Sequence, residues 1–144
     1  MTVYHVPFKA MASTCEVVLD APTLAQAEQW AQPGIDEVLR IERTYSKQKI
    51  LELYLNSVYL GRGSWGIELA ARGYFGKPAK ELTVEEGALL AGLTKGPNYF
   101  SPDRHPGRAQ ERLAYVLSRL QEDGAIAAEQ SGRGLPALPT LVPY

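Results

Sequence analysis

The strongest constraint on the fold of this chain is a run of apolar residues at helical spacing between residues 46 and 120. Ser46 can cap a helix, and the apolar residues after it recur every three or four positions, as in an amphipathic helix. This first helical stretch carries Ile50, Leu51, Tyr54, Leu55 and Val58. Because the same spacing returns in three later stretches, we expect an α-helical lobe from Ser46 to Gly124.

The three later stretches have their own start and stop signals. The first of them carries Ile67, Ala70, Ala71 and Tyr74 on one side. The second runs from Val84 to Leu93 and opens with a T-x-x-E capping box at Thr83 and Glu86. The third places Leu113, Val116, Leu117 and Leu120 inward, with Arg108, Arg112 and Arg119 on its flank. Gly124 can end that helix, and the Pro/Gly-rich residues 131–144 are predicted to be a frayed tail.

Residues 1–46 follow a different pattern. The segment from Val3 to Asp20 is predicted to be β, since it is rich in β-branched residues and closes at an Ala-Pro pair. Thr23 is a suitable N-cap for a helix that begins at Leu24. Pro33 and Gly34 interrupt the helical spacing, which then resumes, so we expect a kinked helix or a helix pair that ends near Thr44.

Composition excludes several classes of function. The chain has 144 residues and a formal net charge of -1, so no basic field indicates nucleic-acid binding. Its one cysteine, Cys15, and its two histidines, His5 and His105, form no cluster with metal-ligand spacing, and we expect no metal site. No apolar run approaches the ~20 residues that a membrane-spanning helix needs. Residues 1–14 have no secretory signal pattern, so the sequence shows no route out of the cytoplasm and the compartment stays unassigned.

The glycines at positions 61, 63 and 66 match the spacing of a dinucleotide-binding fingerprint. That fingerprint works only when a strand precedes it, because the pyrophosphate must meet the start of the following helix. Here a predicted helix precedes the glycines. We therefore expect a glycine-rich turn with positive φ angles between two helices.

A long ordered series of motifs occupies the helical part of the chain. It opens with K-x-x-I-L-E-x-Y-L-N at residues 47–56 and continues with G-I-x-x-A-A-x-x-Y-F-G-K at residues 66–77. L-T-x-x-E-x-A-L-L-A-G-L follows at 82–93, then P-x-x-Y/F-S-P at 97–102, and R-x-x-x-V-L at 112–117. This series resembles the C-terminal half of glycosyltransferase family 51, the peptidoglycan glycosyltransferase domain of class A penicillin-binding proteins. The resemblance spans residues 45–130.

The resemblance implies a fold, a substrate and a location. The fold would be mainly α, a partial lysozyme-like helical lobe preceded by a short β segment and helix. The substrate would be the lipid-linked disaccharide-pentapeptide precursor of peptidoglycan, which the family polymerises into glycan strands at the periplasmic face of the inner membrane. No cofactor is implied.

The family's catalytic motifs do not occur in these 144 residues. They are E-D-x-x-F-x-x-H-x-G, G-x-S-T-x-x-Q-Q and R-K-x-x-E, whereas this sequence has no Phe-x-x-His, no Gln-Gln pair and no Arg-Lys pair. Inverting glycosyl transfer needs a carboxylate to deprotonate the acceptor and cations to stabilise the diphosphate leaving group. We therefore assign no catalytic residue and expect the chain to be inactive alone.

Three polar-tipped residues are the candidates for substrate binding. Glu52, Asn56 and Tyr59 fall at i, i+4 and i+7, which would place them on one face of the first helix. Without the family context, a solvated helix face would be the simpler interpretation. With it, Tyr59 is the best candidate for a substrate contact, and Arg62 would add an exposed and screened charge beside that face.

Residues 1–46 resemble the start of a different family, the FAD:protein FMN transferases. The segments F-K-A-M-A-S-T-C-E at 8–16, which includes Met11, and E-V-L-R-I-E-R-T-Y-S at 37–46 carry this resemblance. The flavin- and metal-binding parts of that family would follow residue 46 and are absent.

The sequence therefore predicts three segments: 1–46, a partial glycosyltransferase domain at 47–130, and the tail at 131–144. A fragment of a glycan polymerase is favoured, because its motifs cover most of the chain. A truncated flavin-transferase-like protein and a non-enzymatic chimeric fusion are the alternatives.

Overall fold

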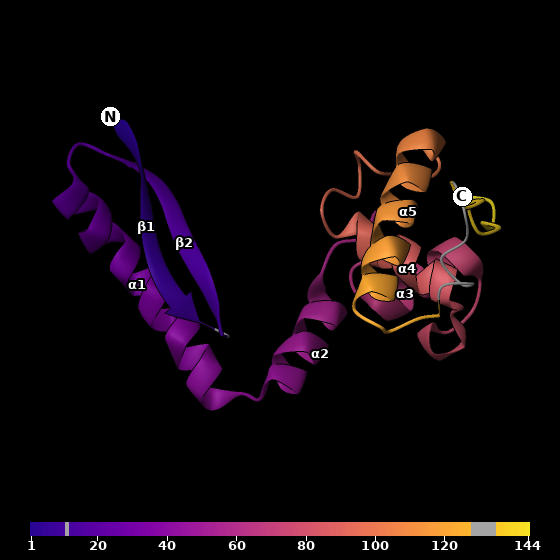
Figure 1. Ribbon diagram of the computed structural model, residues 1–144, viewed down its shortest axis with the longest axis horizontal. Helices are drawn as coiled ribbons and strands as arrows, with labels where there is room; N and C mark the ends of the chain where they lie inside the picture. The colour runs from indigo at the N-terminus through magenta and orange to yellow at the C-terminus, as the bar shows by residue number, and fades with distance from the viewer. Residues whose placement is uncertain (11, 128–134) are drawn as a thin grey trace. The chain divides into compact units, whose positions relative to one another are not determined.

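The computed structural model describes residues 1–10, 12–127 and 135–144, and Figure 1 shows its helices and strands. The chain divides into two compact units, residues 1–53 and residues 54–144. The predicted segments 1–46, 47–130 and 131–144 stay predictions, because they rest on family resemblance and not on compactness.

The first unit is a β-hairpin covered by one long helix. Strands β1 (Thr2–Ala10) and β2 (Ser13–Ala21) pair antiparallel, with Val6 opposite Val17. The hairpin confirms the predicted β segment, although Met11 lies outside the described residues. Helix α1 (Leu24–Thr44) packs on the hairpin around a small core. That core consists of Val6, Ala21, Ala27, Ala31 and Ile35.

Helix α1 begins as predicted and is one helix that ends at Thr44, so of the two expected forms the helix pair is excluded. The hydroxyl of Thr23 accepts a hydrogen bond from the backbone N–H of Gln26 at 3.3 Å, which confirms the N-cap. The helix then runs through Pro33 without interruption. A proline removes one hydrogen bond of the helical ladder, but contacts of the flanking turns with the hairpin hold both sides of Pro33 in one helix.

Helix α2 (Lys47–Ser57) forms where the sequence predicts it, but its apolar side is not buried. The Ser46 hydroxyl accepts a hydrogen bond from the N–H of Lys49 at 3.2 Å, as a cap should. None of the residues of α2 is buried, and Leu51 and Tyr54 are 55% and 48% exposed. The amphipathic spacing thus predicts the helix correctly, but periodicity shows only which side of a helix can pack and not whether that side is buried.

The second unit is helical and contains the larger core. It consists of α3 (Ile67–Phe75), the short 3₁₀ helix η1 (Ala79–Glu81), α4 (Val84–Leu93) and α5 (Pro106–Glu122). The largest fully buried side chains are Leu60, Tyr74, Leu89, Leu90, Leu93, Leu113 and Leu117. The capping box of Thr83 and Glu86 is present in full, and Gly124 follows α5 with a φ of 71°. The predicted helical lobe is therefore confirmed.

The prediction of a frayed tail was wrong for the part of the tail that the structure describes. Leu138 and Leu141 pack against the core of the second unit, and the N–H of Val142 donates to the carbonyl of Tyr74 at 2.9 Å. Residues 131–134 lie outside the described residues. A proline-rich segment lacks any periodic signal, but a few apolar side chains and one backbone hydrogen bond are sufficient to hold it on a surface.

We expect residues 1–40 to be much less protected from hydrogen exchange than residues 50–120. The first core consists mostly of alanines, whereas the second buries seven large side chains. Because a buried leucine contributes about 1.5–3 kcal/mol, the second unit should open far less often. Hydrogen exchange with mass spectrometry of the full chain measures this. Equal protection of the two ranges would contradict the expectation.

Candidate functional site

The site is built on the glycine-rich turn between α2 and α3. Gly61, Gly63 and Gly66 have φ angles of 89°, 65° and 86°, as predicted for such a turn. The N–H of Leu60 donates to the carbonyl of Ser64 at 3.0 Å, and Tyr59 pairs with Trp65 as an isolated antiparallel bridge. The rings of Tyr59 and Trp65 lie 5.0 Å apart. The turn thus fixes the backbone around Tyr59.

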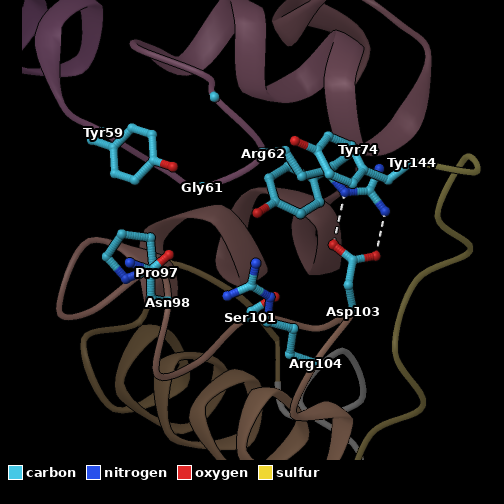
Figure 2. A pocket seen from close by; sticks show the side chains of 11 residues that line it. Tyr59, Gly61, Arg62, Tyr74, Pro97, Asn98, Ser101, Asp103, Arg104 and Tyr144 are labelled. Carbon is cyan, nitrogen blue, oxygen red and sulfur yellow. Dashed lines mark hydrogen bonds and ion pairs between the residues drawn. The ribbon is translucent and has the colours of Figure 1, made fainter.

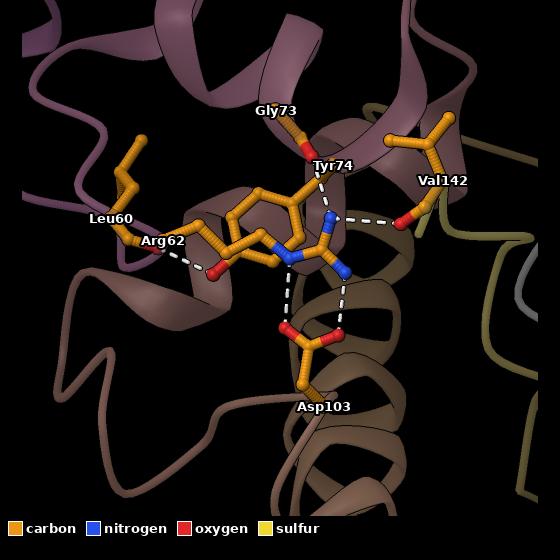
Figure 3. Close-up of polar contacts among 6 residues, drawn as sticks. All are labelled: Leu60, Arg62, Gly73, Tyr74, Asp103 and Val142. Carbon is orange, nitrogen blue, oxygen red and sulfur yellow. Dashed lines mark hydrogen bonds and ion pairs between the residues drawn. The ribbon is translucent and has the colours of Figure 1, made fainter. Parts of the chain in front are cut away.

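Arg62, at the tip of this turn, is buried and donates four hydrogen bonds (Figure 3). Its side chain is 4% exposed. Its Nε and Nη2 donate to the two carboxylate oxygens of Asp103 at 2.8 and 2.5 Å, and its Nη1 donates to the carbonyl oxygens of Gly73 and Val142 at 2.5 and 3.0 Å. The guanidinium also lies 4.6 Å from the ring centre of Tyr74. The Arg62 side chain therefore joins its own turn to α3, to the loop that carries Asp103 and to the C-terminal segment.

The expectation of Arg62 as an exposed charge was therefore wrong. Its partner Asp103 is far away in the sequence, and such a pairing leaves no local pattern. The hydrogen bonds from Arg62 lower the pKa of Asp103, and the carboxylate of Asp103 raises the pKa of Arg62. Burial raises the pKa of Tyr74 to about 12, and its hydroxyl donates to the carbonyl of Leu60 at 2.9 Å. All three groups keep their usual neutral-pH charge states.

A small open pocket lies beside this cluster (Figure 2). Its volume is about 110 Å³. It is lined by Tyr59, Gly61, Arg62, Gly63, Tyr74, Pro97, Asn98, Ser101, Asp103, Arg104 and Tyr144. Tyrosine rings, an amide, a hydroxyl, a carboxylate and two arginines therefore line one cleft. These are groups that stack on and hydrogen-bond to polar ligands.

The structure separates the three predicted binding residues. Tyr59 lines the pocket and is half-buried. It lies two residues beyond the end of α2, so it does not share a helical face with Glu52 and Asn56. Asn56 is exposed and does not line the pocket. Glu52 belongs to the first unit, is exposed, and pairs with Lys49 at 2.8 Å. Their roles as substrate contacts stay predictions.

Sequence reasoning missed the residues from the loop between α4 and α5. Asn98, Ser101 and Arg104 all line the pocket. The only signal for them was the P-x-x-Y/F-S-P motif, which marks the loop as part of a family pattern without assigning a role. Their approach to Tyr59 depends on the packing of α3, α4 and α5, which no local spacing reports.

Three carboxylates of the second unit, Asp103, Glu68 and Glu86, have partners within the chain. Asp103 is the one carboxylate among the pocket-lining residues of the described chain, and it is bound to Arg62. Glu68 accepts from the N–H of Ala79 at 2.9 Å and from Arg72, and these bonds lower its pKa. Glu86 accepts from the N–H of Thr83 at 2.7 Å and pairs with Lys77. All three carboxylates therefore accept hydrogen bonds from groups of the chain itself.

Neither a metal cluster nor a membrane span occurs in the described part of the chain. No three His, Cys, Asp or Glu side chains in residues 1–10, 12–127 and 135–144 gather closely enough to hold a metal ion. No helix in these ranges combines the length and apolar character needed to cross a membrane.

Comparison with known proteins identifies the class. A family model described as transglycosylase matches residues 35–121, which is more than half of the chain. The chain therefore belongs to the transglycosylase family. The resemblance of residues 1–46 to flavin transferases stays a prediction.

Two similar relatives are penicillin-binding proteins. Penicillin-binding protein 1A of Aquifex aeolicus is 52% identical over 92 residues, which cover 64% of this chain and 13% of that protein. Penicillin-binding protein 1F of Bacillus subtilis is 44% identical over 93 residues, covering 65% of this chain and again 13% of the relative. The chain thus spans about one eighth of the length of these relatives.

A solved structure shares the fold. The crystal structure of penicillin-binding protein 1A from Haemophilus influenzae matches with a TM-score of 0.62 and 39% sequence identity, covering 83% of this chain and 18% of that one. Together with five α-helices and one two-stranded sheet among the described residues, this match confirms the predicted mainly α, lysozyme-like fold.

Proposed function

We propose that this chain is a partial peptidoglycan glycosyltransferase domain of the penicillin-binding protein type. It retains part of the surface that contacts a lipid-linked disaccharide-pentapeptide but does not polymerise this precursor by itself. The family match over residues 35–121 supports the substrate class. The proposal of inactivity rests on the carboxylates.

The observation that carries this proposal is the pairing of Asp103. Glycosyl transfer needs a carboxylate that accepts a proton from the attacking hydroxyl. Asp103 is the pocket-lining carboxylate, but both of its oxygens accept hydrogen bonds from Arg62 and its pKa is lowered. A carboxylate with a lowered pKa is a weak base. The same pair occupies Arg62, so this cation is not available to stabilise a diphosphate leaving group.

Tyr59 and Arg104 support retention of a contact surface. Tyr59 presents a half-buried ring that is held by its contact with Trp65, and Arg104 adds a positive side chain to the same pocket. An aromatic ring and a cation suit a phosphorylated saccharide, because sugar faces pack on rings and phosphate oxygens accept from arginine. Glu52 and Asn56 are proposed as further contacts on the family pattern alone.

We expect the purified full chain to form no glycan strands above background. Loss of general-base catalysis alone removes about 10²–10⁴-fold in rate, and loss of leaving-group stabilisation adds to this. The measurement is gel separation of products from a fluorescent lipid-linked disaccharide-pentapeptide. A complete transglycosylase domain in the same detergent is the positive control. Glycan strands made by this chain would contradict the proposal, and Glu52→Gln and Glu68→Gln variants would then identify the base.

A further inference from the structure

The C-terminal residues 135–144 contain no helix or strand, yet they make specific contacts with the second unit. Leu138 and Leu141 pack against its core. Val142 uses both of its backbone groups: its N–H donates to the carbonyl of Tyr74 at 2.9 Å, and its carbonyl accepts from Nη1 of Arg62 at 3.0 Å (Figure 3). The segment is thus recognised through its backbone and its side chains.

The surface that contacts Val142 includes the C-terminal end of α3. Tyr74 lies in the last turn of α3, where carbonyl groups lack helical partners. Its carbonyl is therefore an acceptor for the N–H of an extended chain. Gly76 provides the room, since a Cβ atom there would lie 3.2 Å from Cγ1 of Val142. A peptide that pairs its backbone with protein groups and packs apolar side chains on the surface is a known mode of peptide recognition.

The hydrogen-bond donor on this surface is the guanidinium of Arg62, and other residues hold it in place without the C-terminal segment. Asp103 and the carbonyl of Gly73 hold the guanidinium of Arg62 through three hydrogen bonds that do not involve Val142. Arg62 would therefore keep its orientation if the segment left. A donor and an acceptor fixed in advance lower the cost of binding a peptide.

We propose that the surface formed by Arg62, Tyr74 and Gly76 is a binding site for an extended apolar peptide, and that residues 135–144 are its built-in and reversible ligand. Leu138 and Leu141 are the anchors, and Val142 supplies the backbone pair. Tyr144 also lines the pocket beside Arg62, so occupancy of the peptide site changes one wall of that pocket.

The test uses a fluorescent peptide with the sequence of residues 135–144 and three full-length proteins. In a Leu138→Asp/Leu141→Asp variant the chain's own segment can no longer bind, and the labelled peptide should bind in its place. In the wild type, the tethered segment competes at an effective concentration in the millimolar range. Thr140→Asp is the matched control, because Thr140 is exposed in the same segment. Fluorescence anisotropy should show at least about tenfold tighter binding to the double variant than to the other two proteins.

Two results would overturn the proposal. One is a folded double variant that binds no peptide, and the other is equal binding to all three proteins. If the double variant loses cooperative unfolding, hydrogen exchange of the wild type decides instead. A reversible ligand requires the Val142 amide to exchange faster than core amides such as those of Leu90 and Leu113. Exchange of Val142 at the core rate would show that the segment is a permanent part of the core.

Discussion

Arg62→Ala should lower the free energy of unfolding by about 3 kcal/mol, because it leaves a partly buried carboxylate without its partner. Arg62 is 4% exposed and Asp103 is 31% exposed, so water compensates Asp103 only in part. The substitution also removes hydrogen bonds to the carbonyl groups of Gly73 and Val142. Urea denaturation of the full chain, followed by circular dichroism, measures the change.

A matched control separates burial from charge. Arg119 pairs with Glu122 at 2.5 Å, but both side chains are 55% exposed, so Arg119→Ala should cost no more than about 0.5 kcal/mol. Equal losses for the two variants would contradict the account of Arg62.

The Arg62–Asp103 pair also predicts that stability depends on pH. The folded-state pKa of Asp103 is lowered, so its contribution is present above the unfolded pKa and is lost as the pH falls below about 4. The stability difference between wild type and Asp103→Asn should shrink over that range.

Gly66→Ala should also be severely destabilising and should lower the free energy of unfolding by about 3 kcal/mol or more. Gly66 has a φ of 86° and a ψ of 158°, a region essentially restricted to glycine. An added Cβ would also lie 2.6 Å from the carbonyl oxygen of Asn56, which is backbone and cannot rotate away. The same denaturation experiment measures the effect.

Gly63→Ala is the control for this prediction. Gly63 also has a positive φ, 65°, but no atom lies within 4 Å of an added Cβ. Gly63→Ala should therefore lower the free energy of unfolding only by the cost of the left-handed conformation, about 1–2 kcal/mol. If Gly66→Ala were as mild as Gly63→Ala, the close packing of the turn against Asn56 would be wrong.

Helix starts were predictable because their signals are local. The Thr83 hydroxyl and the Glu86 carboxylate meet within one turn, so the capping box can be read directly from T-x-x-E. The caps at Thr23 and Ser46 were predictable for the same reason. The positive φ angles of the glycine-rich turn were predictable because glycine has no Cβ and adopts them without a steric penalty.

The site was only partly predictable, because its contacts are distant in the sequence. Arg62 and Asp103 are 41 residues apart, and Arg62 and Val142 are 80 apart. Helical spacing grouped Tyr59 with Glu52 and Asn56, but α2 ends at Ser57 and the glycine turn carries Tyr59 to the pocket. Periodicity cannot report such groupings, since they depend on how the helices pack.

The central claim is that a substrate-contact surface around Tyr59 survives without catalysis. Titration of the ¹⁵N-labelled full chain with a transition-state-mimicking phosphoglycolipid tests it most directly. We expect weak binding with shifts at Tyr59 and its pocket neighbours, and about fivefold weaker binding by Tyr59→Ala, since an aromatic contact contributes about 1 kcal/mol. Tyr115→Ala, which removes an exposed ring outside the pocket, should bind like the wild type. No shifts around Tyr59 at high ligand concentration, or shifts unchanged in Tyr59→Ala, would contradict the claim.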